Sequence, residues 1–321
     1  ALINIHFPID STAMQRARER LKFEELFYIQ MQILRQMKRR EQNEGFTMPI
    51  VGKYFNTFYK TCLPFDLTNA QKRVVREIQA DIKSGKQMNR LLQGDVGSGK
   101  TMVALLTALL AIDNGYQVCI MAPTEILANQ HYDSICKMLS PLASSPNSLI
   151  ASSPKVALLT GSTTAKQRQP LHEQLLNGEI NLLIGTHALI EDSVQFANLG
   201  LCIIDEQHRF GVAQRAKLWN KNTRPPHILV MTATPIPRTL AMTVYGDLQV
   251  SIIDELPPGR KPVQTLHYVN TRRTSINQFI EQQISLGRQV YVVYPLIKEN
   301  DKMELQDLQN GYAQLCQTFP Q

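Results

Sequence analysis

Short apolar stretches alternate with longer amphipathic ones through the middle of the 321-residue chain. Each apolar stretch has the length and the near-continuous hydrophobicity of a strand buried on both faces. Most of the segments between them have the length and periodicity of helices. This alternation predicts an α/β fold, a doubly wound parallel sheet with helices on both faces. The predicted strands are Leu91–Gln93, Gln117–Ala122, Lys155–Thr160, Ile180–Gly185, Leu199–Asp205 and His227–Thr232, and the predicted helices are Lys100–Ile112, Glu125–Leu139, Thr164–Leu176 and Gln214–Trp219.

The pattern changes on both sides of this alternation, which predicts three domains. An extended apolar segment over residues 1–11 precedes a helix that Ser11 or Thr12 can cap and that runs to about Arg40. We therefore expect a helical linker over residues 1–62 and the α/β domain over residues 63–256. A proline-rich run then leads into the start of a second α/β unit, over residues 257–321. In that unit we expect strands at Val263–Val269 and Gln289–Tyr294 and a helix at Thr274–Leu286.

The segment that follows the first predicted strand has the complete pattern G-x-x-x-x-G-K-T, from Gly94 to Thr101. Glycines at these positions let backbone N–H groups approach phosphate oxygens, and the helix that begins near Lys100 directs the positive end of its dipole to the same place. In this pattern the lysine reaches the terminal phosphates and the threonine hydroxyl holds Mg²⁺. The sequence therefore predicts a phosphate-binding loop.

A helix over Asn69–Lys83 precedes the phosphate loop, and Thr68 has the position of its N-cap. Gln71, three residues after this cap, has two interpretations. It can complete a capping box with Thr68. Alternatively, its amide can read the adenine edge of a nucleotide just ahead of the loop.

A second candidate site lies where the strand Leu199–Asp205 ends in two carboxylates. Asp205 can hold Mg²⁺ opposite Thr101, and Glu206 can activate water at the γ-phosphate. Gln207 and His208 can sense the γ-phosphate. An Asp-Glu pair at a strand end can also be a simple helix cap, but its combination with a complete phosphate loop favours the catalytic interpretation. His208 has no second His or Cys at zinc spacing, so we expect no zinc site.

Other short polar segments also follow predicted strands. Because ligands of open parallel sheets bind at the carboxyl ends of the strands, we expect these segments to share one rim with the phosphate loop. They are Pro123-Thr124, Thr186-His187 and Thr232-Ala233-Thr234. The two threonines of the last segment can bridge the carboxylate segment and a nucleic-acid face. They also fit a threonine-capped turn fixed by the two prolines that follow.

Composition adds a preference for certain partners. The net charge of +7 and the pI of about 9.1 favour a polyanionic partner, although basic globular proteins are common. None of the five cysteines forms a C-x-x-C pair, which is typical of reduced, buried thiols in a reducing compartment. No apolar run reaches the ~18 residues of a transmembrane helix.

Three segments together resemble superfamily 2 helicases and translocases, and within them the RecG family of bacterial DNA helicases. They are the loop Gly94–Thr101, the run DEQHRFGV at Asp205–Val212 and the run MTATPIPRTL at Met231–Leu240. The resemblance implies a RecA-like first motor lobe, the start of a second lobe, and a helix at 12–40 similar to the linker after the family's DNA-binding wedge domain. It also implies ATP-driven remodelling of branched DNA, by regression of stalled forks and branch migration of Holliday junctions, in recombination and repair.

The resemblance also assigns roles to individual residues, with ATP and Mg²⁺ as cofactors. It implies a monomer in the bacterial cytoplasm that acts on branched DNA, with single-stranded-DNA-binding protein as a further candidate partner. The implied catalytic residues are Lys100, Glu206, Gln207 and His208; the nucleotide-binding residues Thr68, Gln71, Gly94, Asp95, Gly97, Ser98, Gly99, Lys100 and Thr101; the metal ligands Thr101 and Asp205; the DNA-binding residues Pro123, Thr124, Thr186 and His187; and the coupling residues Thr232 and Thr234.

Two other interpretations stay open. Transcription-repair coupling factors have a similar motor that would couple to RNA polymerase, but they typically have Phe in place of Ser98 and Glu in place of Gln207. The third interpretation is a nucleotide-binding module without hydrolysis, because the family's wedge domain and arginine-finger motifs are missing from this stretch. An arginine finger contributes ~10³ or more in rate, so we expect this stretch alone to be weakly active or inactive.

Overall fold

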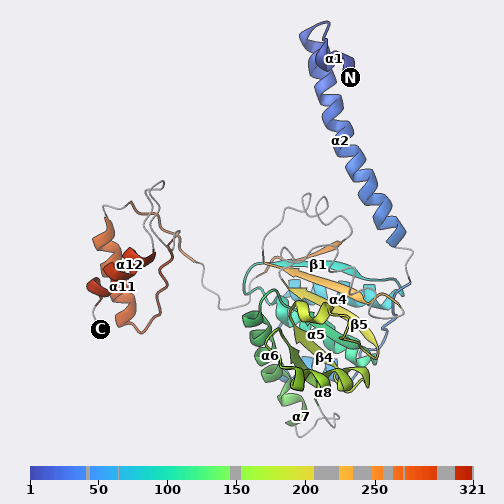
Figure 1. Cartoon of the computed structure of the whole chain (residues 1–321), viewed down its shortest axis with the longest axis vertical. Helices are drawn as coiled ribbons and strands as arrows, with labels where there is room; N and C mark the ends of the chain where they lie inside the picture. Colours follow the sequence, from blue (N-terminus) through green and yellow to red (C-terminus); the bar gives the residue numbers. More distant parts are fainter. Residues whose placement is uncertain are drawn as a thin grey trace. The chain divides into compact units, whose positions relative to one another are not determined.

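The computed structural model describes residues 1–40, 44–63, 65–144, 153–205, 224–233, 248–255, 263–269, 272–294 and 308–319 (Figure 1). The chain divides into two compact units, Ala1–Arg260 and Lys261–Gln321. The first unit contains the sheet. The predicted helix at Gln214–Trp219 lies outside the described residues.

A seven-stranded sheet forms the centre of the first unit, and every neighbouring pair of strands is parallel. The strand order is β3-β4-β2-β5-β6-β1-β7. All six predicted strands are present, so the predicted α/β, RecA-like fold class is confirmed. The strands are β1 (Asn89–Gly94), β2 (Gln117–Met121), β3 (Val156–Leu159), β4 (Leu182–Gly185), β5 (Leu199–Asp205), β6 (His227–Thr232) and β7 (Gln249–Ile253).

Helices cover both faces of this sheet, as the unbroken hydrophobicity of the strands requires. Leu92 and Ile203 belong to a core shared with α4, α5 and α6, whereas their neighbours Leu91 and Ile204 face a second core shared with α8 and η2. The helices of this unit are α1 (Leu2–His6), α2 (Ser11–Arg40), α3 (Lys53–Thr57), the π-helix η1 (Phe58–Cys62), α4 (Asn69–Lys83), α5 (Lys100–Asp113), α6 (Glu125–Leu139), α7 (Pro141–Ser144), α8 (Ala165–Leu176) and the 3₁₀-helix η2 (His187–Ile190).

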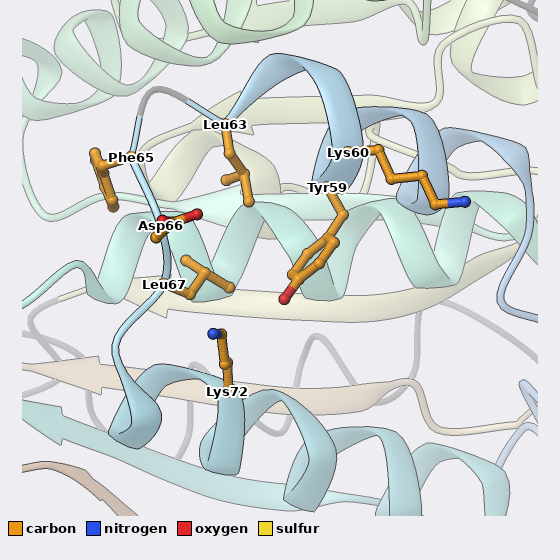
Figure 2. Close-up of a pocket in the computed structure, with 7 residues that line it drawn as sticks. All are labelled: Tyr59, Lys60, Leu63, Phe65, Asp66, Leu67 and Lys72. Carbon is orange, nitrogen blue, oxygen red and sulfur yellow. The ribbon is translucent and has the colours of Figure 1, made fainter.

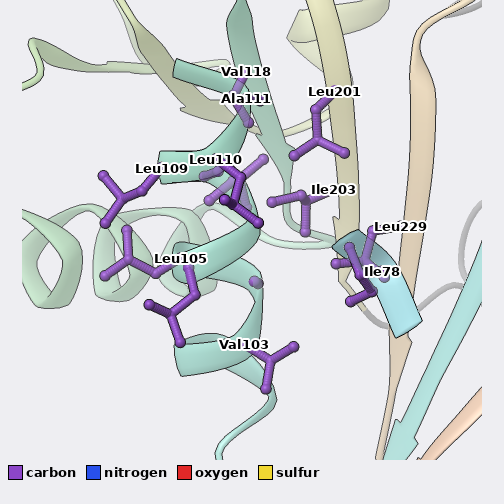
Figure 3. Packing of buried hydrophobic residues seen from close by; sticks show 14 of the residues in the cluster. Ile78, Val103, Leu105, Leu109, Leu110, Ala111, Val118, Leu201, Ile203 and Leu229 are labelled. Atoms are coloured by element: carbon purple, nitrogen blue, oxygen red, sulfur yellow. The ribbon is translucent and has the colours of Figure 1, made fainter. Parts of the chain in front are cut away.

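Helix α5 is buried around its whole circumference, since every residue from Met102 to Ile112 is buried. Its leucines pack among Ile78 of α4 and strand residues such as Leu201 and Leu229 (Figure 3). Burial of one such leucine contributes about 1.5–3 kcal/mol. This packing fixes the N-terminus of α5, and therefore the phosphate loop, relative to the sheet.

Strand β7, at one edge of the sheet, was not predicted, because the polar residues Gln249 and Ser251 interrupt its apolar run. Polar contacts from Arg90 hold it there. Arg90 is 7% exposed, and its guanidinium donates to Ser251 Oγ at 2.6 Å and to Gln249 Oε1 at 2.7 Å. It also pairs with Asp81 of α4 at 2.7 Å. One buried cation therefore joins α4, β1 and β7.

The N-terminal region differs from its prediction in two respects. Residues 2–6 form the short helix α1, which contacts α2, instead of an extended segment. The β-branched residues Ile3 and Ile5 therefore lie in a helix, although such residues are enriched in strands. The cap of α2 is Asp10, whose Oδ1 accepts from the Ala13 backbone N–H at 2.6 Å, instead of Ser11 or Thr12. Aspartate is an equally good N-cap because its oxygen also accepts from a free N–H of the first turn.

The second unit contains α11 (Arg273–Ser285) and α12 (Leu308–Thr318). The first of these confirms the helix predicted at Thr274–Leu286. The two predicted strands are wrong: the backbone at 263–269 and 289–294 has no sheet pairing. In the part of this unit that the structure describes, no strand lies alongside them, and a strand needs a partner for its backbone groups.

Two further predictions concern the residues that the structure describes. Cys119 and Cys202 are free and buried, as expected, and burial raises the pKa of the Cys202 thiol. Among the helices in the described ranges, none combines the length and hydrophobicity needed to cross a bilayer.

His227 links the segment before α3 to the sheet from a fully buried position. Its Nδ1 accepts from the Met88 backbone N–H at 2.9 Å, and its Nε2 donates to the Phe46 carbonyl oxygen at 2.8 Å. Burial disfavours the imidazolium and lowers the pKa of His227 from 6.5 to about 4. Protonation would also remove the acceptor that Met88 needs.

We expect His227 to make stability pH-dependent. Between about pH 6.5 and 4 the unfolded chain binds a proton that the folded chain excludes, so stability is complete above pH 6.5 and falls as the pH drops toward 4. The loss is on the order of 3 kcal/mol. Urea unfolding of the wild type and of His227→Asn at several pH values measures it, with the exposed His6→Asn as the control. If the free energy of unfolding changed with pH equally in the wild type and in His227→Asn, this assignment would be contradicted.

Candidate nucleotide-binding site

Three of the predicted site segments lie side by side at the carboxyl edge of the sheet. Strand β1 pairs with β6, with Gln93 opposite Thr232, and β6 pairs with β5, with Met231 opposite Asp205. Because these strands are parallel, the loop after β1, Asp205 at the end of β5 and Thr232 at the end of β6 reach the same edge. The strand order therefore assembles one site from segments that are distant in the sequence.

The phosphate loop turns sharply between β1 and α5. Gly97 and Gly99 have φ values of +78° and +88°, in the left-handed region that favours glycine. Within the residues that the structure describes, no side chain caps the N-terminus of α5. The first N–H groups of this helix therefore point out of its end at the position where an anion is stabilised.

Lys100 is the first residue of α5, and its side chain folds back over the loop. Its Nζ donates to the carbonyl oxygens of Gly94, at 2.7 Å, and of Asp95, at 3.0 Å. Both acceptors are neutral carbonyl oxygens, whereas a phosphate would add the Coulomb attraction between opposite charges. A phosphate in the loop is therefore a stronger partner for the same ammonium group.

Gln71 connects helix α4 to the phosphate loop. Its Oε1 accepts from the Thr68 backbone N–H at 2.9 Å, and Thr68 Oγ1 accepts from the Gln71 N–H at 3.2 Å, which confirms the predicted capping box. Its Nε2 donates to the Ser98 carbonyl oxygen at 2.8 Å. Gln71 is fully buried, and the second interpretation, recognition of adenine, stays a prediction.

The contact between Gln71 and the loop requires glycine at position 99. A Cβ atom on Gly99 would lie 2.3 Å from Gln71 Nε2, a distance that real Cβ atoms essentially never show. The loop and the cap of α4 therefore fit together only without a side chain there. The Ser98 hydroxyl is buried beside them and has no hydrogen-bond partner among the described residues.

Asp205 forms a hydrogen bond that the sequence did not reveal. Its Oδ2 accepts from His131 Nε2 at 2.8 Å, and the two side chains are 14% and 12% exposed. His131 lies on α6, the helix that follows β2. Because β2 pairs with β5, with Met121 opposite Ile204, α6 begins beside the end of β5. The pairing depends on this strand order, which no local sequence pattern encodes.

Two cavities adjoin this edge of the protein. The first, of about 420 Å³, lies beside the phosphate loop and is lined by Phe65, Gly99, Thr101, Met102, Gln130, His131, Ser134 and Met138. The second, of about 320 Å³, lies between η1 and α4 and is lined by Tyr59, Lys60, Leu63, Phe65, Asp66, Leu67 and Lys72 (Figure 2). Phe65 lines both cavities. Phe65 was not selected from the sequence, although its position just before the cap of α4 could have identified it as a site residue.

The predicted DNA-contacting residues differ in their exposure. Thr124 Oγ1 accepts from the Leu127 N–H at 3.3 Å and so caps α6, and Pro123 is half-buried beside it. His187 is exposed, whereas Thr186 is 4% exposed and its hydroxyl has no partner within the described ranges. The predicted residues Glu206, Gln207, His208 and Thr234 lie outside the described residues.

One structural element on the same edge was not singled out in the sequence. The Glu125 carboxylate accepts from the hydroxyl of Thr160, at 2.8 Å, and from that of Ser162. Hydrogen bonds from Ser162 and Thr160 lower the pKa of Glu125. These bonds join the segment after β3 to the start of α6. The segment follows a strand, so the rule used for the other rim segments also identifies it.

Comparison with known proteins places this site in a family. The family model for DEAD/DEAH box helicases matches residues 68–243. The ATP-dependent DNA helicase RecG of Bacillus subtilis is 48% identical over 321 residues, which cover 99% of this chain and 45% of that protein. RecG of Thermotoga maritima is 47% identical over 322 residues, which cover 100% of this chain and 40% of that protein.

The comparison with solved structures also finds RecG. A RecG structure bound to a three-way DNA junction superposes with a TM-score of 0.80 at 44% identity and covers 98% of this chain and 40% of that one. The helicase MrfA bound to DNA has a TM-score of 0.53 at 17% identity, which shows a shared fold alone. The chain spans between about a third and a half of the length of the RecG relatives that it matches.

We expect Gly99→Ala to weaken nucleotide binding at least tenfold, because its Cβ would displace Gln71 and its left-handed backbone would be strained. Gly115→Ala is the matched control, since Gly115 has a φ of +80° but nothing within 4 Å of its Cβ position. Titration with a fluorescent ATP analogue measures both. Equal nucleotide affinity in the two variants would contradict the role of the Gln71 contact.

Proposed function

Because the chain belongs to the DEAD/DEAH box helicase family, we propose that the protein is an ATP-dependent DNA helicase that remodels branched DNA. The observation that carries this proposal is the similarity to RecG, which extends through both units of the chain. The proposed reactions are regression of stalled forks and branch migration of Holliday junctions, in recombination and repair. A solved structure shows RecG bound to a three-way DNA junction, which supports a branched substrate here.

The phosphate loop supplies the proposed ATP site. The amides of Gly97 and Gly99 and the N-terminus of α5 would bind the phosphates, with Lys100 as the mobile cation. The cavity beside Gly99 and Thr101 would accept the rest of the nucleotide, with Phe65 available to stack on the base.

Thr101 and Asp205 would hold Mg²⁺, and their oxygen donors fit this ion. Mg²⁺ commonly takes one or two protein oxygens and completes its shell with waters and phosphates. When bound, the ion neutralises charge on the β- and γ-phosphates.

Glu206, Gln207 and His208 complete the proposed chemistry, on the basis of the family resemblance. Glu206 would accept a proton from the attacking water, and Gln207 and His208 would report the γ-phosphate. Lys100 would stabilise the charge that develops on the γ-phosphate. Asp205 immediately precedes these three residues, so the end of β5 would bring them to the phosphate loop.

The DNA would follow the rim formed by the segments after β2 and β4. Pro123, Thr124, Thr186 and His187 would approach its backbone, in agreement with the net charge of +7. Thr232, at the end of β6, and Thr234 would couple this face to the ATP site. The proposed DNA substrate implies action in the bacterial cytoplasm. We further propose that the protein acts as a monomer and that single-stranded-DNA-binding protein is a partner.

We expect two substitutions in the full-length protein to separate binding from hydrolysis. Lys100→Ala should abolish ATP binding because the loop loses its cation. Glu206→Gln should keep binding and lower turnover at least 10²-fold because the general base is lost. Nucleotide titration and steady-state ATP turnover with and without forked DNA measure these effects. Lys155→Ala, at an exposed pair with Glu179, is the control. Normal turnover by Glu206→Gln would refute its catalytic role.

We also expect binding of forked DNA to depend steeply on salt. A surface that contacts six or more phosphates releases counterions, so affinity should fall by about 10³ between 50 and 200 mM salt. Fluorescence anisotropy with a labelled fork at several salt concentrations measures the slope. An affinity that does not change with salt would exclude tracking along the DNA backbone.

A further inference from the structure

His131 is the residue in this site whose role is not explained by the phosphate loop or by the carboxylate segment. It lies two turns into α6 and contacts Asp205, the proposed metal ligand, at 2.8 Å. We propose that His131 is a positioning residue that holds the Asp205 carboxylate in the orientation that binds Mg²⁺. This inference rests on the proposed function.

The hydrogen bond fixes an otherwise free torsion. The terminal torsion of an aspartate has a broad energy profile, so the carboxylate plane is set by its partners. An ionised carboxylate only accepts hydrogen bonds, so His131 Nε2 is the donor and Oδ2 of Asp205 the acceptor. The other carboxylate oxygen, Oδ1, would then serve as the ligand of a metal ion or of its water shell.

His131 suits an indirect role better than direct ligation. Mg²⁺ prefers oxygen donors, which Thr101 and Asp205 provide, and an imidazole nitrogen is a poor ligand for it. Groups that hydrogen-bond to a metal ligand typically change metal affinity 10–100-fold when they are removed. His131 makes such a hydrogen bond to a proposed metal ligand, Asp205, and this geometry fits an indirect role.

Helix α6 holds His131 firmly in place. Ala128, Ile135 and Leu139 of the helix are buried in the core, and Thr124 caps its first turn. His131 also lines the cavity that contains Thr101. The imidazole therefore approaches Asp205 from a rigid element, on the side where the other proposed metal ligand lies.

The test uses the full-length protein and the affinity for a fluorescent ATP analogue, measured in EDTA and over a Mg²⁺ titration. We expect His131→Leu to raise the Mg²⁺ concentration that gives half of the full effect at least tenfold, and to lower the affinity in EDTA by a much smaller factor, because His131 also lines the cavity proposed for the nucleotide. His131→Gln, whose Nε2 can donate from a similar position, should stay within about threefold of the wild type. Asn129→Leu is the matched control, because Asn129 lies on the same helix and bonds only to the Glu125 carbonyl oxygen in the described contacts.

Each outcome has a definite meaning. A wild-type Mg²⁺ dependence in His131→Leu, or an equal loss of affinity with Mg²⁺ and with EDTA, would overturn the positioning role. If the Leu variant does not fold, the shorter amide of His131→Asn should show the same loss relative to His131→Gln, and the absence of a difference would also overturn it. A wild-type protein that binds no nucleotide, or binds it without any Mg²⁺ effect, would instead refute the proposed ATP site.

Discussion

The burial of helix α5 from Met102 to Ile112 is the constraint on which the site depends. A helix that is apolar all round can exist only where other elements surround it, so α5 must lie between the sheet and its neighbouring helices. Its N-terminus then has a single position, at the end of β1. The phosphate loop is short and turns through two glycines, so it follows that position. Binding geometry at the loop is therefore a consequence of leucine packing farther along the helix.

The sequence predicted those features that depend on local periodicity. Six strands and the helices around the phosphate loop were predicted because buried parallel strands are apolar throughout. Strand β7 was missed because two of its five residues, Gln249 and Ser251, are polar and bond to Arg90, and such contacts carry no apolar signal. The predicted strands at 263–269 and 289–294 were wrong because an apolar stretch becomes a strand only beside a partner.

The candidate site divides in the same way. The glycines, Lys100 and the capping box of Thr68 and Gln71 form a contiguous motif or a helix start, and both can be read from spacing. His131 could not be, because it reaches Asp205 only through the pairing of β2 with β5. Phe65 became a candidate site residue only because the structure shows that it lines two cavities. Contacts between elements distant in sequence were thus the part that required the structure.

Helix α6 has contacts that serve both halves of the proposed function. Its first turn is bound to the segment after β3 through Glu125 and Thr160, on the side proposed for DNA. Two turns later His131 contacts the carboxylate proposed for the metal. A rigid helix with these two attachments would move as one body, so a displacement at its start would reach Asp205 without any intermediate loop.

The contact between Gln71 and Gly99 has a consequence for how this protein can change through evolution. The two residues come from different elements, yet the amide of one occupies the space that a side chain at the other would need. A larger residue at position 99 requires a smaller one at position 71, and that change would remove the half of the capping box that the Gln71 side chain supplies and the tether to the loop. We therefore expect the effects of substitutions at positions 71 and 99 to be coupled and not additive.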